Sequence, residues 1–107
     1  ESVLSQVELG EIEYNKTRIN QSFQYLVNFS NTKLREKKYE DALFFSRYAY
    51  VKAKTYEEKG NVLFLIANIH ESMQNYTKAK IIYRQILKFY PGEENLVKRL
   101  KKKLLSL

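Results

Sequence analysis

Residues 60–93 read GNVLFLIANIHESMQNYTKAKIIYRQILKFYPGE, and this stretch decides the fold. Apolar side chains recur at helical spacing through residues 62–73 and again through residues 76–90. The polar residues 74–75 separate the two segments, and Pro91 ends the second because proline cannot continue a helix. The stretch therefore predicts two antiparallel helices joined by a tight turn.

Small residues stand where these two helices would meet. Ala67 belongs to the packed face of the first helix, and Ala79 belongs to that of the second. Because helices approach to roughly 8–10 Å only where the facing side chains are short, this pair predicts a closely packed hairpin. Upstream, Ser30 and Ala42 stand in the same arrangement. The sequence therefore contains one helical hairpin twice.

The second copy resembles the tetratricopeptide repeat (TPR), a pattern of about 34 residues in two helices. The positions of that pattern are held by Leu63, Ile66, Ala67, His70, Ala79, Tyr83 and Pro91. Leu63, Ala67 and His70 replace the Trp, Gly and Tyr of the family. A weaker first copy holds Leu26, Phe29, Ser30, Tyr39, Ala42, Ser46 and Ala49, so that the resemblance covers residues 20–93.

The two copies are not evenly spaced. Ala42 lies 37 residues before Ala79, which is more than the roughly 34 residues of the family pattern. We therefore expect the second helix of the first copy to run almost a turn longer than its counterpart. We expect the break between the copies at Gly60 and Asn61, since glycine is typical just after the end of a helix.

The resemblance implies an all-α fold, a TPR-like alpha-alpha superhelix (solenoid) of two helix-turn-helix repeats with flanking N-terminal and C-terminal capping helices. The flanking helices are needed because such repeats cannot bury their apolar faces alone. Lys101 stands where a third repeat would need its small residue, which favours a cap. We expect a single TPR-like domain over residues 1–107, with an N-terminal helix region at 1–19, repeat 1 at 20–59, repeat 2 at 60–92 and the C-terminal capping helix at 93–107.

One flank of each first helix is left over for function. At about 100° per residue, this flank lies nearly opposite the packed face. In the TPR family it lines a concave groove that holds a segment of a partner, and the resemblance implies such a groove here. The groove positions of the second copy are Asn61, Phe64, Asn68, Glu71 and Ser72; those of the first are Gln24, Val27, Asn31, Leu34 and Arg35. The alternative is a solvated flank with two incidental apolar residues.

Some family members grip the terminal carboxylate of a partner through Lys, Asn and Arg residues of this groove. Val27 and Leu65 stand here where such a Lys and such an Asn belong. The sequence therefore argues against binding of chaperone tails.

The C-terminal end forms a basic patch of Lys98, Arg99, Lys101, Lys102 and Lys103. Such a field attracts acidic proteins, nucleic acid or anionic lipid without selecting among them, and a charge run is also typical of a solvated helix face. Lys outnumbers Arg by 14 to 5, and the scarcity of Arg argues against specific nucleic-acid recognition. Residues 1–14 carry −4 and the whole chain +7, so residues 15–107 carry +11. We expect these oppositely charged ends to favour self-association or pairing with further repeats.

The sequence contains few of the residues that catalysis generally requires. One His, one Asp and no Cys do not assemble a nucleophilic triad or a thiolate metal site, and the three Gly are isolated rather than grouped in a phosphate-binding loop. His70 falls on the packed face of its helix, where a structural role is expected. We therefore expect no enzymatic activity, no metal and no cofactor.

The sequence thus predicts a protein-interaction scaffold or adaptor that binds a partner segment in its groove or packs within a larger assembly. Two alternatives stay open: binding of an anionic surface, membrane or RNA, through the basic C-terminal helix, and peptide sensing as part of a larger regulator. The identity of the partner is left open.

The compartment is poorly marked. The longest apolar run, residues 62–67, is far shorter than the ~20 residues of a transmembrane helix, so no span is predicted. The absence of Cys leaves the redox compartment open. Because the chain opens at Glu1 rather than Met, we expect a processed or shortened chain whose targeting segment would already be gone. We expect a soluble protein, cytoplasmic by default, with the periplasm also allowed.

Overall fold

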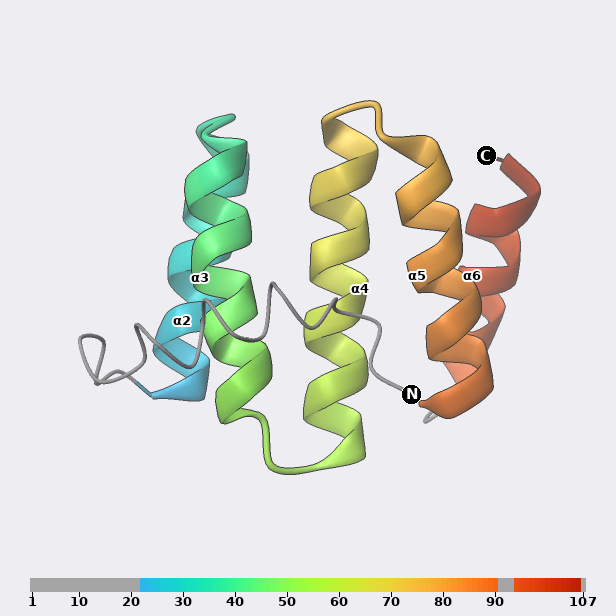
Figure 1. Ribbon diagram of the computed structural model, residues 1–107. Coiled ribbons are helices and arrows are strands. Elements are labelled where there is room, and N and C mark those ends of the chain that lie inside the picture. Colours follow the sequence, from blue (N-terminus) through green and yellow to red (C-terminus); the bar gives the residue numbers. More distant parts are fainter. Residues whose placement is uncertain (1–21, 91–93, 107) are drawn as a thin grey trace.

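The computed structural model describes residues 22–90 and 94–106, and every regular element in these ranges is an α-helix (Figure 1). The prediction of an all-α fold is confirmed for this part of the chain. The N-terminal helix predicted over 1–19, with its acidic residues, lies outside the described residues. The helices are α2 (Phe23–Arg35), α3 (Tyr39–Lys52), α4 (Tyr56–Ser72), α5 (Tyr76–Phe89) and α6 (Glu94–Ser106).

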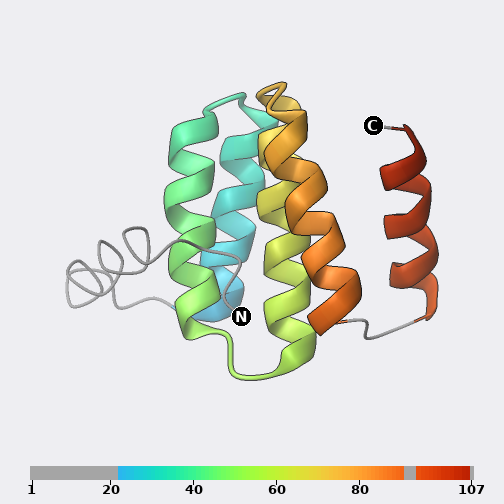
Figure 2. The ribbon, with the colours of Figure 1, turned by 45° about the vertical axis from the view of Figure 1, so that its right-hand side comes forward.

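Each helix packs against the next one along the chain, with its direction reversed (Figure 1). The pairs are α2 with α3, α3 with α4, α4 with α5 and α5 with α6, whereas α2 and α4 meet only slightly. Figure 2 shows α6 at the outer edge of this row, beyond α5. The described helices therefore form a layered row of antiparallel neighbours. None of them is both long enough and apolar enough to cross a lipid bilayer.

The four predicted small residues lie at the centre of the two hairpins. Ser30 and Ala42 are completely buried between α2 and α3, and Ala67 and Ala79 are completely buried between α4 and α5. The hydroxyl of Ser30 donates a hydrogen bond of 2.7 Å to the backbone carbonyl of Ala42. The first hairpin thus adds a polar link to its close contact, which is favourable because the buried hydroxyl has its partner.

The two hairpins also have the same type of turn between their helices. Lys37 and Gln74 follow α2 and α4 and have φ angles of 63° and 64°. In both turns, the next residue donates its backbone N–H to a carbonyl five residues earlier: Lys38 to Lys33 at 2.9 Å and Asn75 to His70 at 2.8 Å. This is the Schellman arrangement, which satisfies carbonyls at the end of a helix. The repeat seen in the sequence is therefore also a repeat of backbone geometry.

The predicted helix end at Gly60 and Asn61 is wrong. Helix α4 begins at Tyr56, so the boundary drawn between residues 59 and 60 falls inside it. Thr55 caps the helix by accepting a bond of 3.0 Å from the N–H of Glu58, and the Glu58 carboxylate accepts one of 2.8 Å from the N–H of Lys54. This resembles a capping box, whose Thr-x-x-Glu signature is present in the sequence.

Gly60 has a packing role within α4. A Cβ atom at this position would stand 3.2 Å from the Cβ of Tyr90, which is a tight contact. The missing side chain lets the end of α5 approach the first turns of α4. Glycine here serves a close approach between helices rather than a helix end.

The extra helical turn that was predicted at the end of the first copy is found at the start of α4 instead. Helices α3 and α5 have the same length of 14 residues, so the expectation of a longer second helix in the first copy is wrong. Helix α4 has 17 residues and α2 has 13. The additional residues of the longer spacing form the first turn of α4, because the Thr55 cap starts that helix early.

Substituting a large residue for Ala79 tests the close contact. We expect Ala79→Leu to lower the free energy of unfolding by about 1–3 kcal/mol, because the added methyl groups overpack the α4–α5 contact. Thr77→Leu, at an exposed position of the same helix, is the control and should change the free energy little. Urea denaturation followed by circular dichroism measures both. Equal effects of the two substitutions would contradict the packing described here.

Candidate functional site

A hollow of about 480 Å³ opens between α4 and α6. It is called the α4–α6 groove below. Helix α4 contributes a half-buried aromatic ring and an amide, and α6 contributes three cations and a hydroxyl. The lining residues are Phe64, Asn68, Arg99, Lys102, Lys103 and Ser106.

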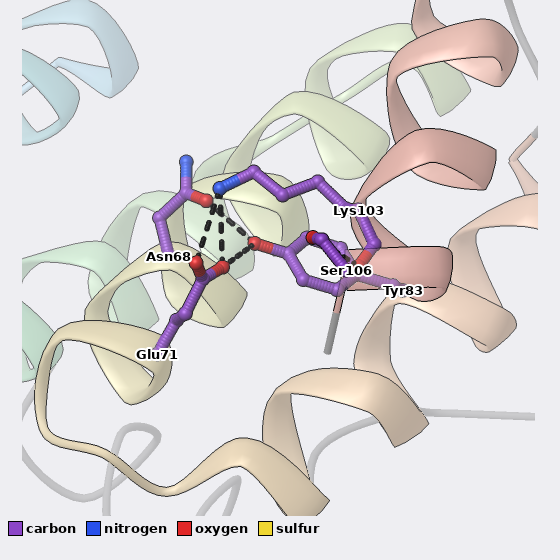
Figure 3. A network of polar contacts seen from close by, with 5 residues as sticks. All are labelled: Asn68, Glu71, Tyr83, Lys103 and Ser106. Carbon is purple, nitrogen blue, oxygen red and sulfur yellow. Dashed lines mark hydrogen bonds and ion pairs between the residues drawn. The ribbon is translucent and has the colours of Figure 1, made fainter.

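A polar network joins three helices along one wall of this groove (Figure 3). The hydroxyl of Tyr83, on α5, lies 2.6 Å from Oδ1 of Asn68 and 2.9 Å from Oε1 of Glu71. A hydroxyl has one proton, so it donates to one of these oxygens at a time. Because the Asn68 oxygen faces this network, its amide nitrogen points away from it (Figure 3).

Burial keeps the Tyr83 hydroxyl protonated. Desolvation raises the pKa of this phenol well above its ordinary value, and the hydrogen bond to Glu71 and the negative charge of that carboxylate raise it further. Tyr83 therefore stays a hydrogen-bond donor into the alkaline range in which an exposed tyrosine ionises.

Lys103 ties α6 to α4. Its Nζ lies 3.1 Å from Oε1 and 3.3 Å from Oε2 of Glu71. The carboxylate of Glu71 thus serves both Tyr83 and Lys103, and its charge is balanced by the lysine. Leu100, which is completely buried one turn earlier on α6, adds an apolar anchor to this contact.

Arg99 lies over an aromatic ring. The centre of its guanidinium stands 5.0 Å from the centroid of the Phe64 ring, which is within the range of a cation–π contact. Phe64 in turn packs against the ring of Tyr83, with centroids 5.6 Å apart. A guanidinium in such a contact keeps N–H donors that can still form hydrogen bonds.

The C-terminal side of the structure is strongly basic. Helix α5 contains four basic residues and no acidic one, and α6 contains five basic residues and one acidic residue. Together the two helices carry a formal charge of +8. Among the described residues, neither Arg99 nor Lys102 has an ion-pair partner. The groove is therefore an anion-attracting surface with an aromatic floor.

Two sets of residues that the sequence suggested separately meet in this place. Phe64, Asn68 and Glu71 were predicted as groove positions, and Arg99, Lys102 and Lys103 were predicted as part of a basic patch. The structure brings these six side chains together around one hollow and its wall. Lys98 and Lys101 are exposed but do not line it, and neither do Asn61 and Ser72, which are exposed on α4.

The predicted positions of the first copy are not part of this groove. Their polar side chains bond within α2: Gln24 Nε2 to Asn28 Oδ1 at 2.9 Å, Asn31 Nδ2 to the carbonyl of Val27 at 3.1 Å, and Arg35 Nη2 to Thr32 Oγ1 at 3.2 Å. Val27 and Leu34 are half-buried and pack against the core. The described contacts therefore give α2 no share in the α4–α6 groove.

Sequence reasoning missed two residues of the site. Tyr83 was identified only as a position of the repeat pattern, and its side chain is buried, but its hydroxyl is the donor at the centre of the network. The signal was the hydroxyl itself, since a buried Tyr generally needs a partner where a Phe would not. Ser106 lines the groove from the last turn of α6, and nothing in its local sequence indicates that.

Within residues 22–90 and 94–106, no three His, Cys, Asp or Glu side chains come together as a metal site would require. His70 is buried in the core of the hairpin pair, away from the groove lining. Comparisons with protein-family models, with curated proteins and with solved structures find no match for this chain. Its function is therefore argued from its own residues.

Tyr83→Phe tests the network. We expect the substitution to lower the free energy of unfolding by about 0.5–1.5 kcal/mol at neutral pH, because it removes one buried hydrogen bond. The difference should shrink as the pH rises above about 10, because the tyrosine of the unfolded chain then ionises while the buried hydroxyl of Tyr83 does not. Tyr76→Phe, at an exposed position of α5, is the control.

Urea denaturation at several pH values measures both variants. A difference between wild type and Tyr83→Phe that stays constant into strong alkali would contradict the raised pKa. A difference equal to that of Tyr76→Phe would contradict the hydrogen-bond network.

Proposed function

We propose that this chain is a non-enzymatic protein-interaction module of TPR type, a scaffold or adaptor, whose α4–α6 groove holds a segment of a partner protein. In this proposal, α2–α3 and α4–α5 are two stacked repeats of a solenoid, and α6 is the capping helix that completes the stack.

Three features support a TPR-like solenoid. Each helix packs mainly on its neighbours in the chain, which is typical of repeat proteins. Both hairpins bury small residues completely, and the turn of each contains one non-glycine residue with a positive φ angle. The spacing of 37 residues between Ala42 and Ala79 departs from the family pattern of about 34, and the early start of α4 accounts for that departure.

The α4–α6 groove is the observation that carries the proposed function. It combines an aromatic ring, exposed cations and an amide nitrogen directed away from the internal network. An extended segment needs these groups: a surface for an apolar side chain, charges for an acidic one and a donor for a backbone carbonyl. A network that fixes Glu71, Tyr83 and Lys103 holds this surface in one shape, which reduces the ordering cost of binding.

A second candidate is attachment of α6 to an anionic surface. Leu105 is 89% exposed, and Lys98 and Lys101 are exposed on the same helix. An exposed Leu beside lysines is typical of helices that lie on anionic lipid. Against it, Arg99 and Lys103 are engaged with Phe64 and Glu71 rather than directed outward.

Peptide selection tests the proposed function. A random peptide library is panned on the whole chain, and the selected peptides are mapped by chemical-shift perturbation of backbone amides. We expect shifts at Phe64, Asn68 and Arg99, which face the groove, and none at Ile81 and Arg84, which are exposed on α5.

A matched pair of variants completes that test. Ser106→Trp fills the groove with a bulky ring, whereas Leu105→Trp puts the same ring on the neighbouring exposed position outside it. We expect the first to weaken peptide binding roughly tenfold or more and the second to leave it nearly unchanged. A library that yields no binder, or equal binding by the two variants, would rule out the groove as the partner site.

A further inference from the structure

We infer that the α4–α6 groove selects an acidic segment from within a partner chain, one that places a carboxylate beside an apolar side chain. This inference rests on the proposed function and adds the chemistry of the partner. It is carried by the charges that remain unbalanced in the groove and by the contact of Arg99 with the Phe64 ring.

The charge balance at the groove is uneven. Three cations line it, Arg99, Lys102 and Lys103, and Glu71 is the acidic residue of its wall. Both oxygens of Glu71 lie within 3.3 Å of the Lys103 ammonium, so this pair is internally neutral. Arg99 and Lys102 remain, and the described residues offer them no carboxylate. A partner that supplies a carboxylate can pair with both of these cations without breaking the ion pair between Glu71 and Lys103.

The geometry of Arg99 suits a carboxylate. The centre of its guanidinium lies 5.0 Å from the centroid of the Phe64 ring, and this contact restricts the side chain. The fork of N–H donors on a guanidinium matches the two oxygens of a carboxylate, and a side chain already held against a ring loses less conformational freedom when the pair forms. Lys102 follows three residues later on α6, which makes it a neighbour of Arg99 on the helix surface. Both cations can therefore reach one acidic side chain or two successive ones.

The floor of the groove favours an apolar side chain in the partner segment. Phe64 is half-buried and its ring lines the hollow together with Asn68. A side chain that covers this ring would also exclude water from the Arg99 contact, which strengthens the charge-assisted hydrogen bonds. A segment that alternates acidic and apolar residues meets both requirements.

The segment is internal rather than a chain end. Leu65, at one of the two positions already noted for gripping a terminal carboxylate, is only 7% exposed and belongs to the core. Val27, at the other, lies on α2 and packs against the core. Neither of these two positions offers a donor to a terminal carboxylate, and we assign the recognition by Arg99 and Lys102 to side-chain carboxylates.

The probe is a fluorescein-labelled peptide with both ends blocked and the central sequence Glu-Leu-Glu between Gly-Ser spacers. Fluorescence anisotropy with the whole chain, at an ionic strength of about 0.15 M, measures its affinity. We expect this peptide to bind roughly tenfold or more tightly than Gln-Leu-Gln, and several times more tightly than Glu-Ser-Glu. The same peptide with a free C-terminal carboxylate should bind equally well. Equal binding of Glu-Leu-Glu and Gln-Leu-Gln, or clearly tighter binding of the free-ended peptide, overturns the inference.

Adjacent lysines of α6 give a matched pair of variants. Lys102 lines the groove and Lys101 does not, and both are exposed. We expect Lys102→Glu to weaken Glu-Leu-Glu roughly tenfold and to favour Lys-Leu-Lys instead, while Lys101→Glu, with the same change of net charge, has a much smaller effect. Arg99→Lys keeps the charge but loses the planar fork, and it should weaken binding severalfold. Equal losses at Lys101 and Lys102 would show a general charge effect and overturn the inference.

Two further outcomes separate this inference from the proposed function. Library peptides that map to the groove without acidic residues would leave the proposed function standing and overturn the inference. Vesicles of phosphatidylserine and phosphatidylcholine, and a single-stranded RNA, serve as competitors. If the vesicles or the RNA bind to the chain without displacing the peptide, the peptide has a separate site, which supports the inference. If the chain binds the vesicles or the RNA but does not bind the peptide, the inference is overturned in favour of binding to an anionic surface.

Discussion

The close approach of paired helices at small residues is the constraint on which the rest of this structure depends. Ser30 meets Ala42 in the first pair, Ala67 and Ala79 lie on the two helices of the second pair, and all four side chains are completely buried. Where no larger side chain separates two helices, the residues around the contact interlock, and the crossing is determined by these few positions. In the first pair, the bond from the Ser30 hydroxyl to the Ala42 carbonyl fixes the register as well as the distance. A hairpin built in this way has one face in the core and a defined opposite flank.

The same contact determines which side chains of α4 lie on the side that faces α6. With Ala67 against α5, the ring of Phe64 and the polar groups of Asn68 and Glu71 are carried on another side of α4. Tyr83, on the partner helix, reaches that side because the hairpin is narrow enough for its hydroxyl to meet Asn68 at 2.6 Å. The network that fixes the groove is thus a consequence of hairpin packing, and a wider hairpin would leave a buried hydroxyl without its partners.

The fold was predictable where local patterns carry it, and the site was predictable only in parts. Helical spacing and small residues gave the hairpins, since both are read within a few turns of chain. The start of α4 was misplaced because Gly60 was interpreted as a helix end, although the cap at Thr55 had its own signature in the sequence. The residues Phe64, Asn68 and Arg99 were identified, but the sequence did not predict that they lie around one groove. Their proximity depends on how α6 packs, and this long-range contact has no periodic signal in the sequence.

Simple angular geometry lets helix α6 pack against the core and line the α4–α6 groove at the same time. Leu100 points into the core, and at about 100° per residue Arg99 and Lys103 project to one side of it while Lys101 projects to the other. Once Leu100 is buried, the run of basic residues is divided: Arg99 meets Phe64, Lys103 meets Glu71 and Lys102 lines the groove, whereas Lys98 and Lys101 are exposed and do not line it. Leu100 thus decides on which side of α6 each basic residue lies, so the packing of α6 and the shape of the groove cannot be varied independently.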